Sequence, residues 1–407
     1  MNTRTQSLRL RSALALVLVG SLVGVACGSD EDSSATTAAS TSTPASTAAS
    51  TSDAAATTDA AATTEGAPTS DSASSSGGGG EDLSVGLIQI FRQPETNLVA
   101  AGAQTAADEY GASFDWQAPP GIDPPTAISY LRQYETQGLD GVVVDSFPGE
   151  LWVRPLNDAL DSGMALVTEG NYSPDSNVPT HVGEPQAALG VLLADTFAEA
   201  LGPDASGYLQ PGICAAGVAT LESPIAAFRT RMSELLPNVE VRDAVDVNPD
   251  PAQNFTNWQR LFSQNPDALG FFGVCDQDAV NMVKVNETSG TDFLIGSVSG
   301  DSAENIANIQ DGKLLAVVGR NGWVRGYVST KILLANLVDG TPMPEGYVNT
   351  GVELITAENA QAALDVRTAD SPEANLAYYK FYIDRAFDSA AAGGLGPIVS
   401  QDTETEG

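Results

Sequence analysis

The chain has 407 residues, 42% of them hydrophobic, and its 52 acidic and 18 basic residues give a formal net charge of -34. This length exceeds one ordinary core and fits two similar lobes. The acidity argues against binding to nucleic acid or anionic lipid, because phosphate groups need Lys/Arg patches. We interpret it as a solvated surface and not as evidence for a cationic ligand. The single His181 argues against a His-based metal site or a Ser-His-Asp relay, so no metal and no cofactor are expected, and His181 is assigned a structural role.

Residues 1–27 have the three parts of a secretory signal: a basic start, an apolar run over 13–25 and small residues before Cys27. The apolar run is too short and wrongly flanked for a membrane-spanning helix. A cysteine directly after small residues resembles the lipobox of bacterial lipoproteins, in which the chain is cut before the cysteine that carries the lipid. Gly24 departs from the usual leucine of that motif. The alternative is an ordinary cleaved signal with a chance cysteine.

A low-complexity segment of Ser, Thr, Ala, Gly and Asp follows from 28 to 81 and ends in four glycines. Such a segment cannot bury enough apolar surface to fold. As a flexible coil of roughly 50 residues it spans about 40 Å, which suits a domain held away from a membrane. Residues 1–81 are therefore left out of the fold prediction.

The remaining sequence alternates short apolar runs, typical of buried strands, with segments of helical spacing. In the first half, strands are predicted at 84–90, 113–117, 141–145 and 164–168, and helices at 97–110, 125–137 and 155–162. In the second half, strands are predicted at 207–214, 239–244, 268–274, 293–298 and 314–318, and helices at 187–200, 225–235, 255–264, 278–287 and 303–311. This alternation predicts two doubly wound α/β units with parallel sheets. Ligands bind beyond the carboxyl ends of such strands, so two facing edges would form one cleft.

Several segments resemble, in their order and spacing, the periplasmic sugar-binding proteins of the ribose-binding type, which are relatives of the lac-repressor ligand domain. These segments are 85–111, 138–146, 265–280, 311–319 and 350–359, and together they cover roughly 82–357. The resemblance implies the type I periplasmic binding protein fold. In that fold two doubly wound parallel-sheet lobes are joined by a three-crossing hinge, and the solute binds between them.

The resemblance also implies the limits of the lobes. The three hinge crossings would fall near 181–184, 320–321 and 347–351. The first lobe would then hold 82–184 plus 321–348, and the second lobe 185–320 plus 349–407. Residues 360–407 lie beyond the point where chains of this family usually end. Within them, 376–387 is predicted to be an added helix and 404–407 a loose tail.

Ligand-binding residues are expected, by the same resemblance, in the loops that follow the strands. They are Arg92, Gln93, Glu95, Thr96, Asp145, Phe147, Glu169 and Asn171 in the first lobe, and Glu222, Asp276, Ser299, Asp301 and Arg320 in the second. Glu95 and Thr96 stand where relatives often place aromatic rings, and Glu222 stands near the place of an arginine. Carboxylates and amides accept and donate in fixed directions, which suits a polyol. Candidate stacking faces are Trp116, Trp152 and Trp323.

A disulfide is predicted between Cys214 and Cys275, the two cysteines left after Cys27 is assigned to the lipid in an exported, oxidising setting. Each ends a predicted strand of the second lobe, and the first and third strands of a doubly wound unit are neighbours. Neighbouring strands lie about 4.8 Å apart, within the range that a disulfide accepts. The alternative is a pair of buried, reduced thiols.

These observations favour a non-enzymatic solute-binding lipoprotein of an ABC importer, binding a sugar or similar small polar solute. It would be a monomer on the outer face of the cell membrane, attached only by its lipid, with the transporter permease as its protein partner. A ligand-sensing lipoprotein that presents its bound state to a receptor is one alternative. A hydrolase on the same cleft is another, disfavoured because Val298 holds the central place of the segment 296–300, where a nucleophile elbow needs serine.

Overall fold

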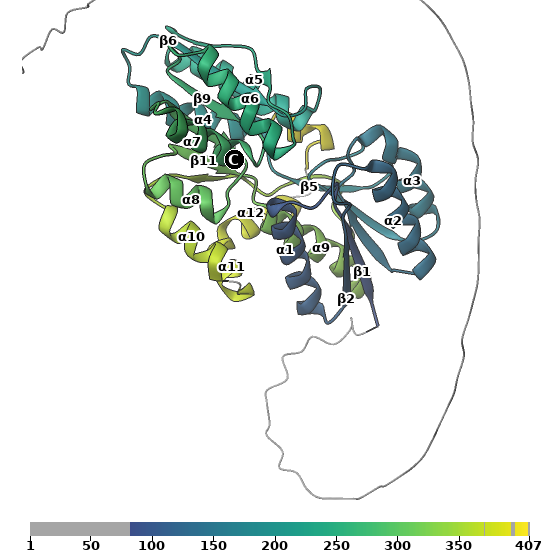
Figure 1. The fold of residues 1–407 in the computed structure, drawn as a ribbon. Coiled ribbons are helices and arrows are strands. Elements are labelled where there is room, and N and C mark those ends of the chain that lie inside the picture. The colour runs from purple at the N-terminus through teal and green to yellow at the C-terminus, as the bar shows by residue number, and fades with distance from the viewer. Residues whose placement is uncertain (1–81, 370, 392–394, 406–407) are drawn as a thin grey trace, which may run out of the picture. The chain divides into compact units, whose positions relative to one another are not determined.

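The computed structural model describes residues 82–369, 371–391 and 395–405, so the predicted signal, lipobox and tether lie outside the described residues. The first sheet is made of β1 (Ser84–Ile88), β2 (Ser113–Gln117), β3 (Gly141–Val144), β4 (Ala165–Glu169), β5 (Thr180–Gly183) and β12 (Gly346–Asn349). The second is made of β6 (Gly207–Ile213), β7 (Val239–Val241), β8 (Val245–Asp246), β9 (Gly270–Gly273), β10 (Leu294–Val298), β11 (Ala316–Gly319) and β13 (Glu353–Ile355). Figure 1 shows the two sheets in separate lobes.

Both sheets have doubly wound strand orders, β12-β5-β4-β3-β1-β2 and β13-β11-β10-β9-β6-β7, with β8 paired to β6 outside this path. Every pairing is parallel except that of β11 with β13. Parallel strands need crossover helices, and the apolar runs that predicted the strands are buried on both faces for that reason. The predicted fold, two parallel-sheet α/β lobes of the type I periplasmic binding protein kind, is confirmed.

Helices cover both sheets. Against the first sheet lie α1 (Pro94–Tyr110), α2 (Pro124–Gln137), α3 (Gly149–Asp161) and α9 (Gly322–Asp339). The second lobe carries α4 (Gln186–Leu201), α5 (Ala219–Leu235), α6 (Pro251–Gln264), α7 (Asp278–Ser289), α8 (Ala303–Gln310) and α10 (Ala360–Ala369). The chain continues with α11 (Pro372–Tyr378), α12 (Lys380–Ala391) and the 3-10 helix η1 (Ile398–Asp402). Within the described residues, none of these helices is long and apolar enough to cross a membrane.

Several helices start earlier than predicted, α3 and α5 by the most, and neither α9 nor α10 was predicted. α3 and α5 run through Pro155 and Pro224, where the prediction had begun each helix at or just after the proline. The segment 322–339 had no assignment and forms α9. Most of α9 is buried, and its apolar residues join the core of the first lobe.

Glycines let the main helix pairs cross closely. A Cβ at Gly102 of α1 would lie 2.0 Å from the carbonyl oxygen of Trp323, and one at Gly326 of α9 would lie 1.9 Å from that of Val99. In the second lobe, a Cβ at Gly190 of α4 would lie 1.9 Å from the carbonyl oxygen of Pro224 on α5. A larger residue would push the helices apart. The close α1–α9 crossing places the first turns of both helices at the same edge of the sheet.

The C-terminal region contacts both lobes, whereas the sequence predicts all of 349–407 in the second lobe. β13 and α10 follow that assignment, but α12 packs against β12 and α9 of the first lobe. The reason is apolar: Tyr379 stacks on Trp323 with 5.7 Å between ring centroids, and Ile383 is buried in the same cluster. The predicted helix over 376–387 is divided at Tyr379 between α11 and α12. Of the predicted loose tail, Glu404 accepts a hydrogen bond from the backbone of Ala188, and 406–407 lie outside the described residues.

Candidate functional site

A cavity of about 160 Å³ lies between the carboxyl ends of the two sheets. First-lobe residues reach it from the ends of β1, β3, β4 and β5, and second-lobe residues from the ends of β6, β9, β10 and β11. This is the place where open parallel sheets bind ligands. A wider outer groove, of about 920 Å³, adjoins the cavity and shares Phe91, Gln93, Glu95, Ile122 and Asp276 with its lining.

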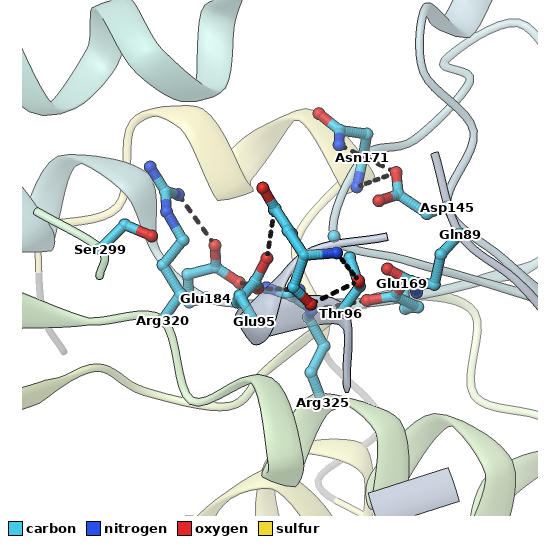
Figure 2. A network of polar contacts seen from close by, with 12 residues as sticks. Gln89, Glu95, Thr96, Asp145, Glu169, Asn171, Glu184, Ser299, Arg320 and Arg325 are labelled. Carbon is cyan, nitrogen blue, oxygen red and sulfur yellow. Dashed lines mark hydrogen bonds and ion pairs between the residues drawn. The ribbon is translucent and has the colours of Figure 1, made fainter. Parts of the chain in front are cut away.

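Arg325, in the first turns of α9, organises the first-lobe side of the cavity. All three of its guanidinium nitrogens donate to carboxylates: Nη2 to Glu95, Nε to Glu169 at 2.5 Å and Nη1 to Glu184 at 2.8 Å. The side chain is 3% exposed, and Figure 2 shows it below the three glutamates. Arginine suits this position because its planar group bonds several carboxylates at once and stays charged when buried. The three carboxylates raise the pKa of Arg325 well above its ordinary value, against the opposing effect of burial.

Arg320 follows β11 and connects the two lobes. Its Nη1 donates to Glu184 at 3.0 Å and to Gln186 at 2.6 Å, while Nη2 donates to the backbone oxygen of Thr220 at 3.2 Å. Glu184 therefore contacts both arginines (Figure 2). Burial opposes ionisation of this carboxyl, but Arg325 and Arg320 together hold its pKa below the ordinary value. Glu184 lies at a hinge crossing, so this ion pair fixes the chain where the lobes meet.

Two further carboxylates line the cavity without an arginine partner. Asp145 Oδ1 accepts from the backbone N of Asn171 at 3.3 Å and from its Nδ2 at 2.8 Å. Asp276 Oδ1 accepts from the hydroxyl of Ser299, while its Oδ2 is buried and has no partner in the protein. Burial, followed by the charge of Glu169, raises the pKa of Asp145 well above the ordinary value. Burial, followed by the charge of Glu95, raises the pKa of Asp276 to about 7.

Backbone strain accompanies this side of the cavity. Ser299 has φ of 70° and Asn321 has φ of 50°, in the left-handed region that non-glycine residues rarely adopt. Each lies just beyond the end of a second-lobe strand, β10 or β11. Such conformations persist where the surrounding structure holds them and often occur at binding sites. At Ser299 the result is a hydroxyl directed at Asp276.

Nine of the thirteen expected ligand-binding residues line the cavity: Gln93, Glu95, Thr96, Asp145, Phe147, Asn171, Asp276, Ser299 and Arg320. Glu169 is fully buried and lies behind the lining, against Arg325. The Thr96 hydroxyl donates to the backbone oxygen of Phe91 at 3.1 Å and accepts from the backbone N of Gln93 at 2.9 Å, so it also holds the start of α1.

Arg92, Asp301 and Glu222 do not line the cavity. Arg92 lies in the outer groove with its guanidinium carbon 4.2 Å from the ring centroid of Trp116. Asp301 forms an ion pair of 2.5 Å with Arg367 of α10, from the C-terminal region. Glu222 accepts from the backbone N of Gly217 at 2.7 Å in the first turn of α5. In each case a partner outside the cavity holds the side chain away from it.

The aromatic faces at the cavity are Phe91 and Phe147 and not the candidate tryptophans. Trp152 and Trp323 are 0% and 1% exposed and belong to the core clusters of the first lobe. Among the cavity residues that sequence reasoning missed, Arg325 is the most consequential. The sequence does offer one sign of Arg325: it is a single arginine among apolar residues at helical spacing over 322–339.

The wall of the cavity on the second lobe contains a disulfide between Cys214 and Cys275, as predicted, with Cα atoms 6.3 Å apart. It joins the ends of the neighbouring strands β6 and β9. His181 is buried in β5 between Thr168 and Gln401, and burial lowers its pKa to about 4. In the described part of the chain, no group of three His, Cys, Asp or Glu side chains has an arrangement that could hold a metal ion.

Comparisons with known proteins agree with this geometry. The family model described as periplasmic binding protein domain matches residues 89–342. The xylose/arabinose-binding protein XylF of Sulfolobus acidocaldarius is 21% identical over 279 residues, which are 65% of this chain and 68% of the relative.

Solved structures show the same fold. An ABC transporter solute-binding protein from Burkholderia graminis, in complex with D-arabinose, matches with a TM-score of 0.63 and 21% identity over 68% of this chain and 96% of that one. One from Actinobacillus succinogenes, with bound D-allose, matches with a TM-score of 0.63 and 15% identity over 69% and 99%. The matches agree with the resemblance to ribose-type sugar-binding proteins that the motifs predicted. The chain therefore belongs to the periplasmic binding protein family.

Proposed function

We propose that this chain is the solute-binding lipoprotein of an ABC importer and that it binds a sugar or similar small polar solute in the cavity between its lobes. The observation that carries the proposal is a small cavity lined from the strand ends of both sheets by directional polar groups. A solute that contacts both lobes binds the closed form more tightly than the open form and so shifts the protein toward closure. A transporter can then distinguish the loaded protein from the empty one.

The lining fits a solute with several hydroxyl groups. Asp145 and Asp276 offer carboxylate acceptors, and Asn171 and Arg320 carry donors. Phe91 offers an apolar face for ring carbons. A buried polar group left unmatched costs about 1–3 kcal/mol, so a solute without matching groups is rejected.

The cellular setting is inferred from the N-terminal sequence. Cys27, which lies outside the described residues, would carry the lipid, and the segment 28–81 would connect it to the lobes. The protein would act as a monomer on the outer face of the cell membrane, with the importer's permease as its partner. Replacing Cys27 with Ala should release the protein from the membrane fraction, and retention of that variant in the membrane would contradict the anchor.

Binding is tested by a thermal-shift screen of the full chain against sugars, polyols and their amino derivatives. A ligand at 100 times its dissociation constant should stabilise the protein by about 2.7 kcal/mol. Asn171→Ala should lower the affinity for any ligand found in the screen, because Asn171 both lines the cavity and positions Asp145. Glu222→Gln is the matched control, because Glu222 does not line the cavity. If no compound in the screen stabilises the protein, the proposed function is wrong.

A further inference from the structure

The ionisable side chains that line the cavity carry more negative than positive formal charge. Over residues 82–369, 371–391 and 395–405, these side chains are Glu95, Asp145, Glu184, Asp276, Arg320 and Arg325, with no lysine or histidine among the lining. Glu169 adds a fifth carboxylate directly behind them, in contact with Arg325. Two guanidinium groups thus accompany five carboxylates at or directly behind one cavity, and an excess of charge of one sign in a poorly solvated place needs compensation.

Both arginines are already engaged by protein groups. Arg325 donates to three glutamates, and Arg320 donates to Glu184 and Gln186. The carboxylates left without a cation are Asp145 and Asp276, and they come from opposite lobes.

The free oxygens of these two aspartates are available to a ligand. Asp145 is 4% exposed, and its hydrogen bonds from Asn171 all go to Oδ1, which leaves Oδ2 without a protein donor. Asp276 Oδ2 is likewise buried and has no donor among the residues that the structure describes, since the hydrogen bond from Ser299 goes to Oδ1. Each lobe therefore presents one unmatched carboxylate oxygen at the same cavity.

We propose that the solute is a polyhydroxylated amine in its protonated form, an amino sugar or amino polyol, with its ammonium group held by Asp145 and Asp276. This inference rests on the proposed solute-binding function and specifies its ligand class. An ammonium group has three donors and no acceptor, so it satisfies carboxylates from two lobes and neutralises charge as they approach. Phe91 and Phe147 line the same cavity, and aromatic faces also attract an ammonium group.

A neutral sugar matches the cavity less well. Its hydroxyl groups can donate to both aspartates, but they bring no positive charge when the cleft closes and water leaves. Burial raises the pKa of both aspartates, so closure around a neutral sugar favours their protonated forms, whereas an ammonium group stabilises the ionised carboxylates.

The test uses matched probes on the full chain: D-glucosamine, D-galactosamine and D-glucamine, each against its hydroxyl counterpart, with N-acetylglucosamine as the uncharged nitrogen control. Titration calorimetry runs up to about 10 mM. At least one amine should bind about 100-fold more tightly than its hydroxyl counterpart, because only the amine compensates the carboxylates. Asp145→Asn and Asp276→Asn should each weaken that amine about 30-fold or more. These substitutions keep the side-chain shape, and melting of the unliganded variants checks that they fold.

Asp292→Asn, at an exposed position before β10, is the control and should leave binding unchanged. If neutral sugars bind as tightly as the amines, or if neutral sugars bind and no amine does, the amine class is overturned and the sugar-binding function stays intact. Amine binding that survives both aspartate substitutions would also overturn it. Binding of no probe of either class would overturn both the amine class and the proposed function.

Discussion

The two sides of the cavity are built differently. On the first lobe, polar side chains form a continuous network in which Arg325 contacts Glu95, Glu169 and Glu184, and Gln89 donates to Glu169. On the second lobe, the lining alternates apolar residues and the disulfide with polar side chains. The polar side chains are Gln186, Thr220, Asp276, Gln277, Ser299 and Arg320. The first side is thus a charged surface held by its own ion pairs, and the second is a mixed surface of apolar and polar side chains that includes the disulfide.

This difference indicates how affinity and motion are divided between the lobes. The network on the first lobe holds its side chains in place before the solute arrives, which lowers the entropy lost on binding. When the lobes close on a solute, the apolar residues of the second lobe would displace water, and this strengthens the charged contacts that the first lobe makes. Substitutions on the first side should therefore affect folding as well as binding, and those on the second side should be milder.

The largest effect is expected from Arg325→Met, which removes the cation from three buried glutamates. Breaking a buried ion pair by removing one partner costs about 3–5 kcal/mol, because an uncompensated charge stays buried. Urea denaturation measures the change in the free energy of unfolding. Arg154→Met is the matched control: Arg154 pairs with Asp158 on the surface of α3 with 89% of its side chain exposed, and such pairs contribute about 0–1 kcal/mol. Equal losses in the two variants would refute the role given to Arg325.

A smaller loss of stability, of about 2–4 kcal/mol, is expected when the disulfide is removed by replacing Cys214 and Cys275 together with Ala. The bond connects residues 61 apart, and its loss frees the unfolded chain. Denaturation of the double variant and of wild type measures the difference. Thiol labelling of denatured, unreduced protein gives an independent check, since labelling of both cysteines would show that the bond is absent.

A third effect, seen only as a change with pH, is the contribution of Asp276 to stability. Its pKa is about 7 in the folded protein against a usual 3.8, so the folded state holds a proton that the unfolded state has released. That contribution is present below pH 4 and is lost as pH rises through about 7, with a slope of at most about 1.4 kcal/mol per pH unit. Glu95, Asp301 and Arg320 act on the same carboxyl.

The comparison that isolates Asp276 is wild type against Asp276→Asn. It is needed because the lowered pKa of His181, about 4, makes stability rise with pH in the acid range. The stability of wild type relative to Asp276→Asn should decline between pH 4 and 8. A difference that stays constant across this range would show that Asp276 is not buried as described.

The fold was predictable because parallel strands that are buried on both faces appear in the sequence as short continuous apolar runs. Runs such as 141–145 are apolar on both faces, and their regular alternation with helical segments predicts the doubly wound lobes. The loops after these strands gave most of the cavity residues for the same topological reason. The disulfide was predictable because both cysteines end strands that this topology makes neighbours.

The contacts among side chains were not predictable. Asp301 stands at an expected ligand position, but α10 of the C-terminal region provides Arg367, which pairs with it. Arg325 was missed because its role depends on the close crossing of α1 and α9, which brings it to Glu95. Such partners come from segments far apart in the chain, and the sequence of one segment does not indicate which side chain of another segment it contacts.

The central claim, that the solute binds between the lobes, is tested most directly by the distance between spin labels on exposed positions of the two lobes. Labels at Gln133 of α2 and Thr256 of α6 report across the cleft, and labels at Gln133 and Glu150 of α3 report within the first lobe. Saturation with the tightest ligand of the probe panel should shorten the first distance and leave the second unchanged. Saturating binding with no change in the distance across the cleft would contradict the account.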